Sequence, residues 1–256
     1  MRTVLLGLAF SVSLSGTLTA QSTSSASLGA QRANQHYSQG WSQIRAEAWD
    51  AAVREFQEAI DNDPKFALAY YSLGRAHMGR RDFAQAIAAY TRCREMFANG
   101  GSEQFANQME QRQRLTDRIL QYQTALNDAR ARSSAAPTSQ SQNLYIRDLQ
   151  FRITQMEQAR DRHGSFTLDV SVPYFVPMAL GAAYQRSGQF ANAEREYKEA
   201  LAANAQSGET HNNLAVLYLT TGRYDEAESE VRAAEKVGFR VNENLKGDIR
   251  KKKAGG

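Results

Sequence analysis

The chain of 256 residues repeats itself when it is shifted by 34 positions. In its first half, the matched pairs are Trp49 with Phe83, Ala52 with Ala86, Phe56 with Tyr90 and Ala59 with Cys93. In its second half, they are Tyr184 with Tyr218, Gly188 with Gly222, Phe190 with Tyr224, Ala193 with Ala227 and Ala200 with Ala234. A fixed period of this length is typical of a fold in which one small unit stacks on the next. The sequence therefore predicts four stacked units in two blocks.

Each unit has the pattern of two helices joined by a turn. On the first helix a large residue, a small residue and a ring share one face, as in Leu180, Gly181 and Tyr184. A break such as Gly188 follows, and the second helix then starts with an aromatic residue, Phe190, and carries a small residue three positions later. Small residues let two helices approach closely, and rings fill the space between them. With only four prolines in the chain, this pattern predicts an all-α fold.

The same pattern resembles the tetratricopeptide repeat, whose length is 34 residues. The resemblance is carried by the segments Ala69–Cys93 and His211–Ala234. It implies a helical-hairpin solenoid with repeats at 33–66, 67–100, 174–207 and 208–241. The first repeat keeps Gly40, Trp49 and its closing Pro64 but departs from the pattern in its first helix.

Residues 33–100 thus hold repeats one and two, and residues 173–241 hold repeats three and four. Residues 242–256 are expected to form a capping helix and a basic tail. Leu245 and Ile249 lie four positions apart on that helix and would face the end of the stack. The run Arg250–Lys253 is interpreted as a solvated terminus.

An insertion of about 73 residues, 101–172, separates the two blocks. From 102 to 132 there is no Pro or Gly, and apolar residues recur at alternating spacings of four and three, as in a coiled-coil seam. After a turn at 133–140, a second helix over 141–162 carries Tyr145, Leu149, Ile153 and Met156 on one face. We expect a long antiparallel helical hairpin. The alternative is a pair of degenerate repeats that continue the solenoid, since the insertion is two periods and five residues long.

A short segment before Pro173 alternates between apolar and polar residues, from Phe166 to Val172. This period of two indicates an extended chain, but no second strand is evident for it to pair with. We expect an extended linker that lies on the solenoid. The alternative is an exposed strand that accepts a partner strand.

The N-terminus is typical of an exported protein. Residues 1–20 hold one positive charge, a short apolar run and small residues up to Ala20, which is the pattern of a cleavable signal peptide. Residues 21–32 are rich in Ser and Thr and are expected to form a flexible lead. We expect no transmembrane segment and a periplasmic or secreted location. Cys93 is the only cysteine, so no intramolecular disulfide can form.

No pattern for catalysis, a cofactor or a metal is recognisable. A phosphate-binding loop, a nucleophile elbow and a His pair at zinc spacing are all missing from the sequence. The histidines His36, His77 and His211 occupy repeat positions that usually hold a packing ring. The net charge of +4 is modest and spread along the chain, so no nucleic-acid partner is expected. The chain is therefore not expected to be an enzyme.

Protein binding is the function that the resemblance implies. The first helix of each repeat would line a groove that holds an extended or helical segment of a protein or peptide partner. The positions implied for this groove are Tyr37, Trp41, Tyr71, Arg75, Met78, Met178, Gln185, Asn212, Val216 and Leu219. The Lys and Asn positions with which some family members capture carboxylates are not matched, which argues against a cytosolic co-chaperone.

The leading hypothesis is an adaptor of the bacterial cell envelope or periplasm that binds a partner in this groove. The alternative is a structural scaffold that self-associates through the inserted hairpin. A third hypothesis, binding to nucleic acid or an anionic surface through the Arg-rich hairpin and the basic tail, predicts a steep loss of binding with salt.

Overall fold

The computed structural model describes residues 17–99, 108–135, 140–161 and 172–254. Within these ranges the chain forms eleven α-helices and no strand, which confirms the predicted all-α class. The repeat helices are α1 (Thr17–Arg45), α2 (Trp49–Asn62), α3 (Ala67–Gly79), α4 (Phe83–Asn99), α7 (Phe175–Arg186), α8 (Phe190–Ala203), α9 (Gly208–Thr220) and α10 (Tyr224–Lys236). The inserted helices are α5 (Gln108–Ala135) and α6 (Gln140–Asp161), and α11 (Glu243–Ala254) ends the described chain.

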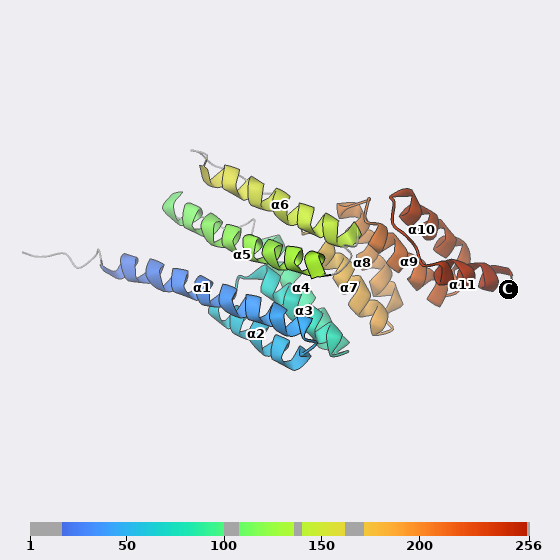
Figure 1. Ribbon diagram of the computed structural model, residues 1–256, viewed down its shortest axis with the longest axis horizontal. Coiled ribbons are helices and arrows are strands. Elements are labelled where there is room, and N and C mark those ends of the chain that lie inside the picture. Colours follow the sequence, from blue (N-terminus) through green and yellow to red (C-terminus); the bar gives the residue numbers. More distant parts are fainter. Residues whose placement is uncertain (1–16, 100–107, 136–139, 162–171, 255–256) are drawn as a thin grey trace, which may run out of the picture.

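The four repeats form one continuous stack despite the insertion. Helices α1 and α2, α3 and α4, α7 and α8, and α9 and α10 pack as pairs, and each pair packs on the next. In particular, α4 contacts α7 directly, so repeat three follows repeat two in space (Figure 1). The two blocks of the sequence are therefore one solenoid, which α11 closes by packing on α10 with Ile249 buried.

A glycine–aromatic pair sets the close approach of the two helices within a repeat. A Cβ added to Gly74 would lie 2.5 Å from the ring of Tyr90, and one added to Gly181 would lie 2.6 Å from the ring of Tyr197. Gly40 meets Phe56 in the same way in repeat one. Repeat four has the larger Ala215 at this position and the smaller Val231 opposite it. Where the first helix carries the larger residue, the second helix thus carries the smaller one, so the two positions do not clash.

The turn inside each repeat contains one residue with a positive φ. In the last two repeats this residue is Gly188 or Gly222, which adopts the left-handed conformation without steric cost. In the first two repeats it is Glu47 (φ 55°) or Arg81 (φ 61°), whose side chains make this conformation unfavourable. The stack therefore keeps the turn geometry even where the local residue opposes it.

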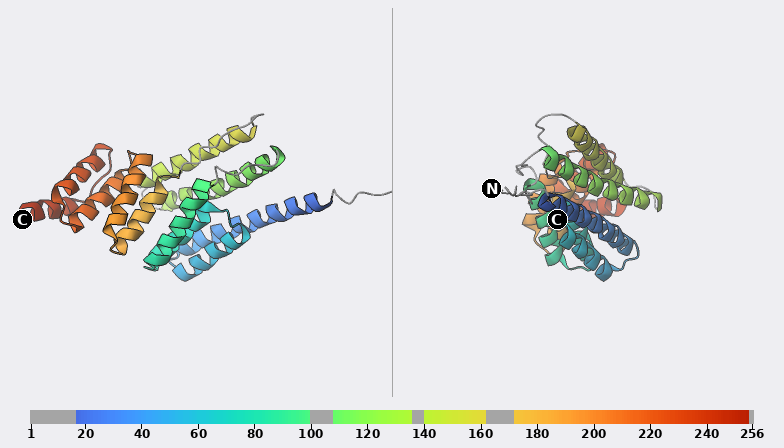
Figure 2. Two further views of the ribbon diagram at one scale, coloured as in Figure 1. Left: turned by 180° about the vertical axis from the view of Figure 1, so that it is seen from behind. Right: turned by 90° about the vertical axis from the view of Figure 1, so that its left-hand side faces the viewer.

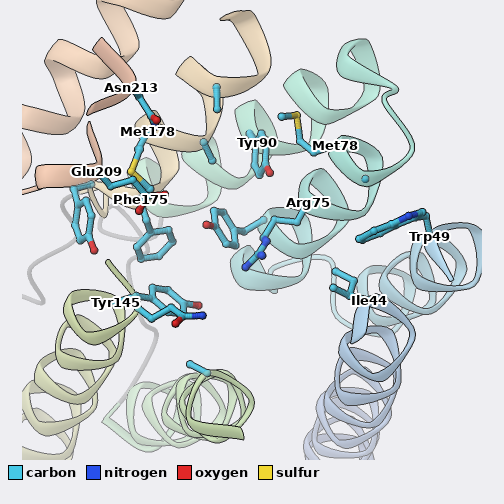
Figure 3. A pocket seen from close by; sticks show the side chains of 17 residues that line it. Ile44, Trp49, Arg75, Met78, Tyr90, Tyr145, Phe175, Met178, Glu209 and Asn213 are labelled. Carbon is cyan, nitrogen blue, oxygen red and sulfur yellow. The ribbon is translucent and has the colours of Figure 1, made fainter. Parts of the chain in front are cut away.

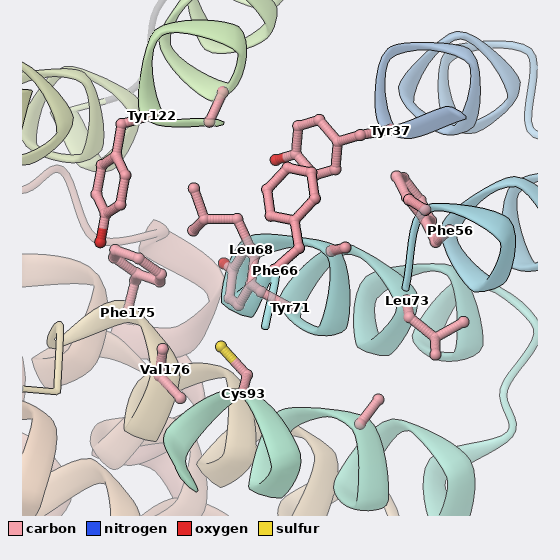
Figure 4. Packing of buried hydrophobic residues seen from close by; sticks show 14 of the residues in the cluster. Tyr37, Phe56, Phe66, Leu68, Tyr71, Leu73, Cys93, Tyr122, Phe175 and Val176 are labelled. Atoms are coloured by element: carbon pink, nitrogen blue, oxygen red, sulfur yellow. The ribbon is translucent and has the colours of Figure 1, made fainter. Parts of the chain in front are cut away.

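The insertion forms the predicted helical hairpin and packs on the repeats. Helices α5 and α6 lie side by side, α5 contacts α1, and the three helices extend away from the stack together (Figures 1 and 2). Apolar residues of the hairpin, including Tyr122 and Leu149, belong to the same buried cluster as the cores of the first repeats. Figure 4 shows Tyr122 in this cluster. Gln121 of α5 also donates a hydrogen bond to Asp63, with 2.6 Å between Nε2 and Oδ2. The hairpin is thus part of the core and not a pair of degenerate repeats.

The structure differs from the sequence prediction at the N-terminus. Residues 21–32, expected as a flexible lead, lie within α1. Ala30 and Ala33 are buried where α1 packs on α2, so packing of small residues outweighs the Ser- and Thr-rich composition. The predicted signal peptide, up to residue 16, and the extended segment 166–171 lie outside the described residues. None of the described helices combines the length and the apolar character that a membrane crossing requires.

Candidate functional site

A pocket of about 490 Å³ lies where the hairpin meets the repeats. One wall is formed by the first helices of repeats two, three and four, namely α3, α7 and α9, and the opposite wall by α5 and α6 (Figure 3). Ala129 near the end of α5 and Gln142 and Tyr145 near the start of α6 line this second wall. We call this space the hairpin pocket. It has the size of the sites that bind small molecules or short peptide segments.

Aromatic rings join the two walls of the hairpin pocket. Phe175, the first residue of α7, contacts both Tyr71 of α3 and Tyr145 of α6. The ring centroids are 5.0 Å apart for Tyr71 and Phe175 and 5.1 Å apart for Tyr145 and Phe175, and both pairs have an edge-to-face geometry. Such pairs are favourable because the positive ring edge meets the negative ring face. The rings therefore hold the hairpin against the repeats and form an apolar floor.

A single guanidinium group, that of Arg75, stands in the wall formed by α3. Its Cζ atom lies 4.9 Å from the centroid of the Trp41 ring, which is a cation–π contact. Among the described residues, no carboxylate lies within ion-pairing distance of Arg75. Burial raises the pKa of Tyr90 and of Tyr174, so both hydroxyl groups that line the pocket stay neutral and offer no negative charge. Arg75 is half-buried and lacks a counter-ion among these residues.

A carboxylate, that of Glu209, lines the pocket from α9. Glu209 lies in the first turn of α9, where the helix dipole favours a negative charge. Ser207 caps this helix by accepting a hydrogen bond from the backbone N–H of Thr210, so the turn that carries Glu209 is fixed. No described cation is paired with Glu209. Figure 3 shows Glu209 and Arg75 entering the pocket from opposite sides of Phe175.

Four of the ten residues predicted for the groove line the hairpin pocket: Tyr71, Arg75, Met78 and Met178. They come from the first helices of repeats two and three, as the resemblance implied. Met78 and Met178 are half-buried, and their flexible thioethers can adapt to different partner side chains.

The predicted groove position is wrong for Tyr37 and Trp41, because both side chains are fully buried with 0% exposure. Tyr37 packs against Phe56 and Phe66, with ring centroids 5.8 Å and 4.8 Å away. Helix α5 packs on α1, which closes this part of the first repeat. Tyr37 and Trp41 are therefore core residues, and Trp41 reaches the site only as the ring beneath Arg75.

The remaining predicted residues lie outside the pocket lining. Gln185 accepts a hydrogen bond from the hydroxyl group of Tyr197, at 2.7 Å. Asn212, Val216 and Leu219 are half-buried on α9, and Leu219 packs on the core of repeats three and four. The pocket is lined instead by Asn213, one position along the same helix.

Several pocket residues lie outside the set predicted for the groove. Gln142 and Tyr145 come from the hairpin, where Tyr145 was predicted only as a seam residue, and no local sequence signal shows how the hairpin folds back. Tyr174 and Phe175 lie at the start of repeat three, ahead of the predicted groove position Met178. Within the described ranges, no group of three or more His, Cys, Asp or Glu residues is arranged to hold a metal ion.

Comparison with known families identifies the repeats. Residues 37–100 and residues 184–238 each match a family model described as tetratricopeptide repeat. Together with the stacked helical hairpins, these matches show that the chain contains tetratricopeptide repeats in both blocks.

An uncharacterized protein of Haemophilus influenzae is 34% identical over 61 residues, which are 24% of this chain and 34% of that protein. The chain thus spans about a third of the length of this curated relative. Among solved structures, a thermophilic tetratricopeptide-repeat protein of Thermus thermophilus is similar over 86% of this chain and 98% of its own, with 18% identity and a TM-score of 0.36. A second, MamA, is similar over 77% of this chain and 93% of its own, with 14% identity and a TM-score of 0.26.

Proposed function

We propose that this tetratricopeptide-repeat protein is an exported, non-catalytic adaptor of the cell envelope that holds a segment of a partner protein in the hairpin pocket. The observation that carries the proposal is the pocket itself. It combines an apolar floor, two half-buried methionines and an unpaired guanidinium group on the face that the first helices of the repeats share. Aromatic residues, Met and Arg are the residue types enriched where proteins bind one another.

The hairpin gives the proposed site a second wall. A partner segment in the pocket would contact Tyr145 and Gln142 of α6 as well as Met78 and Met178 of the repeats. A segment enclosed from two sides loses more water than one bound on an open surface, which favours a small number of strong contacts. The hairpin is therefore proposed to act in recognition together with the repeats.

Export is proposed from the sequence of residues 1–20, which have the charge and apolar run of a signal peptide. A fusion of the whole chain to a reporter that is active only outside the cytoplasm tests this part. Reporter activity that disappears when residues 1–20 are deleted is the expected result. Equal activity with and without these residues would contradict export by this segment.

Photo-crosslinking in cells tests the binding site. A photoreactive amino acid replaces Met78 or Met178 in the pocket, and in a matched control it replaces Lys236, which is exposed on α10. We expect one partner to be crosslinked from both pocket positions and not from position 236, and to be lost with Arg75→Ala. A partner crosslinked equally from all three positions, or no partner from either pocket position, would refute a site in the pocket.

A self-associating scaffold is the second candidate function, and two side chains favour it. Leu120 of α5 and Phe151 of α6 are 40% and 58% exposed, although both are large and apolar. Sedimentation of the purified chain, compared with Leu120→Ser/Phe151→Ser, tests this candidate. An oligomer that dissociates in the double variant supports the scaffold, and a monomer at all concentrations excludes it.

A further inference from the structure

The two unpaired charges of the hairpin pocket have opposite signs and lie on different repeats. Arg75 belongs to α3 of repeat two, and Glu209 belongs to α9 of repeat four. Phe175 of the intervening repeat lies between them in Figure 3. Along the stack, the pocket therefore runs from a positive end over an aromatic middle to a negative end.

Half-buried charges without protein partners are costly unless water or a ligand compensates them. Elsewhere in the described chain, many surface charges have partners, such as Arg223 with Glu194 at 2.6 Å and Lys246 with Glu235 at 2.9 Å. Within the same part of the chain, Arg75 and Glu209 have none, and they do not form a pair with each other. Since these two groups line the same cavity, one occupant with complementary charges at its two ends can pair with both.

We propose that the hairpin pocket takes a peptide segment of mixed charge, in which a carboxylate contacts Arg75, a bulky apolar side chain covers Phe175 and an ammonium or guanidinium group contacts Glu209. This inference rests on the proposed adaptor function and adds the chemistry and the direction of the bound segment. Opposite charges at the two ends reject a segment laid the other way, because like charges would then face each other. The repeats thus fix which end of the segment points to α3.

The planar guanidinium group of Arg75 suits this role. The Trp41 ring holds it in place from below, so little side-chain freedom is lost when a carboxylate binds. The rim of the pocket adds two amides, Gln142 from the hairpin and Asn213 from α9. Amide groups of this kind can donate to and accept from the backbone of an extended segment.

Binding of a defined peptide series to the purified mature protein tests the proposal. Each fluorescent peptide has a Gly/Ser background with one Glu, one central Leu or Phe and one Lys, at several spacings. In the matched control peptides, Gln replaces the Glu, the Lys, or both. Fluorescence anisotropy is measured with wild type, Arg75→Gln and Glu209→Gln. Arg186→Gln on α7 and Glu58→Gln on α2 are exposed charge-matched controls.

We expect each loss of charge, in the peptide or in the pocket, to weaken binding by about fivefold to tenfold. Removing the peptide Glu and Arg75 together should cost little more than either change alone, and the same holds for the peptide Lys and Glu209. Removing the peptide Glu together with Glu209, or the peptide Lys together with Arg75, should weaken binding by the product of the two separate factors, since those groups do not touch. Arg75→Lys keeps the charge and should retain the preference for Glu, which separates recognition from any loss of packing on Trp41.

Three outcomes would overturn the proposal: no peptide of the series binds the wild type, binding does not depend on peptide charge, or all combinations multiply. The crosslinking experiment distinguishes these results from a failure of the adaptor function. A partner crosslinked from Met78 and captured equally by Arg75→Gln would leave the adaptor function standing and exclude the mixed-charge segment. No crosslinked partner from either pocket position would exclude both.

Discussion

Arg94 of α4 and Glu196 of α8 form an ion pair across the joint between repeats two and three, although 102 residues separate them. The Glu196 side chain is only 2% exposed, and Arg94 also lies 3.9 Å from Glu199. The pair thus closes the stack at the place where the insertion leaves the solenoid.

Replacing Arg94 by Ala should therefore destabilise the protein. Glu196 would keep only the more distant Arg195, at 3.5 Å, and removal of one partner from a buried pair costs about 3 kcal/mol. Urea denaturation followed by circular dichroism measures the change in the free energy of unfolding. Arg195→Ala, which removes an exposed side chain beside the same carboxylate, should cost no more than about 1 kcal/mol. Equal losses for the two variants would contradict the role assigned to Arg94.

Gly181→Ala should destabilise the third repeat by about 1–3 kcal/mol, because the new Cβ would lie 2.6 Å from the ring of Tyr197. Tyr197→Val removes the ring that this Cβ would meet, so the double variant should lose less stability than the sum of the two single variants; repeat four combines Ala215 with Val231 in the same way. Thermal denaturation of the single and double variants measures the coupling. Gly247→Ala is the control: a Cβ at this helical position meets nothing within 4 Å, so stability should rise by up to about 1 kcal/mol. Strictly additive effects at 181 and 197 would refute the steric explanation.

Arg81→Gly should stabilise the protein by up to about 1 kcal/mol. Arg81 has a φ of 61°, a conformation that costs about 1–2 kcal/mol for a residue with a side chain, and the greater freedom of Gly in the unfolded chain offsets part of the gain. Glu47→Gly should behave in the same way. Gly188→Ala should have the opposite effect, and Arg186→Gly within α7 should cost about 1 kcal/mol. Chemical denaturation of the four variants provides the comparison.

The ion cluster between repeats three and four predicts an acid-dependent loss of stability. Hydrogen bonds from Arg223 lower the pKa of Glu194 from its ordinary value of 4.5 to about 2. A carboxyl group whose pKa is lowered on folding stabilises the folded state above the unfolded pKa and loses this effect as the pH falls through the folded pKa. The melting temperature should thus fall between about pH 4.5 and pH 2.

Arg223→Gln should reduce this dependence on pH and lower the melting temperature at neutral pH. Arg232→Gln removes an exposed cation that pairs with Glu228 and should leave the acid limb of the profile nearly unchanged. A wild-type profile that persists in Arg223→Gln would show that another group controls the acid transition.

The repeat could be predicted from the sequence because its copies place a small residue and a ring at the same spacing. Gly74 with Tyr90 and Gly181 with Tyr197 are both separated by 16 positions, and this spacing brings a small residue of one helix against a ring of the next. The positions of the helices follow directly. The direct contact between α4 and α7 could not be predicted, because no local pattern tells whether an insertion separates two repeats or leaves them in contact.

The candidate site was predicted only in part for the same reason. Arg75 and Met78 follow from the repeat register, which assigns a face to every residue of α3. Trp41 occupies the register of Arg75 in repeat one but is buried, since α5 covers α1. Tyr145 enters the pocket only because the hairpin folds back on the stack. The repeat register predicts on which face of its helix a residue lies. It does not predict which other helix packs on that face.

The direct joint between α4 and α7 also decides how the molecule would respond to tension. If the two chain ends are pulled apart, the load passes from repeat to repeat and crosses this joint, so the insertion carries no force while Arg94 and Glu196 stay paired. Once the joint has opened and the hairpin of α5 and α6 has unfolded, about 73 residues can extend, or roughly 25 nm of chain. A single repeat of 34 residues would release about half of this length. The insertion would therefore lengthen under force only after the joint between α4 and α7 has opened. An optical-trap trace would show this event as an increase in chain length larger than that of a single repeat.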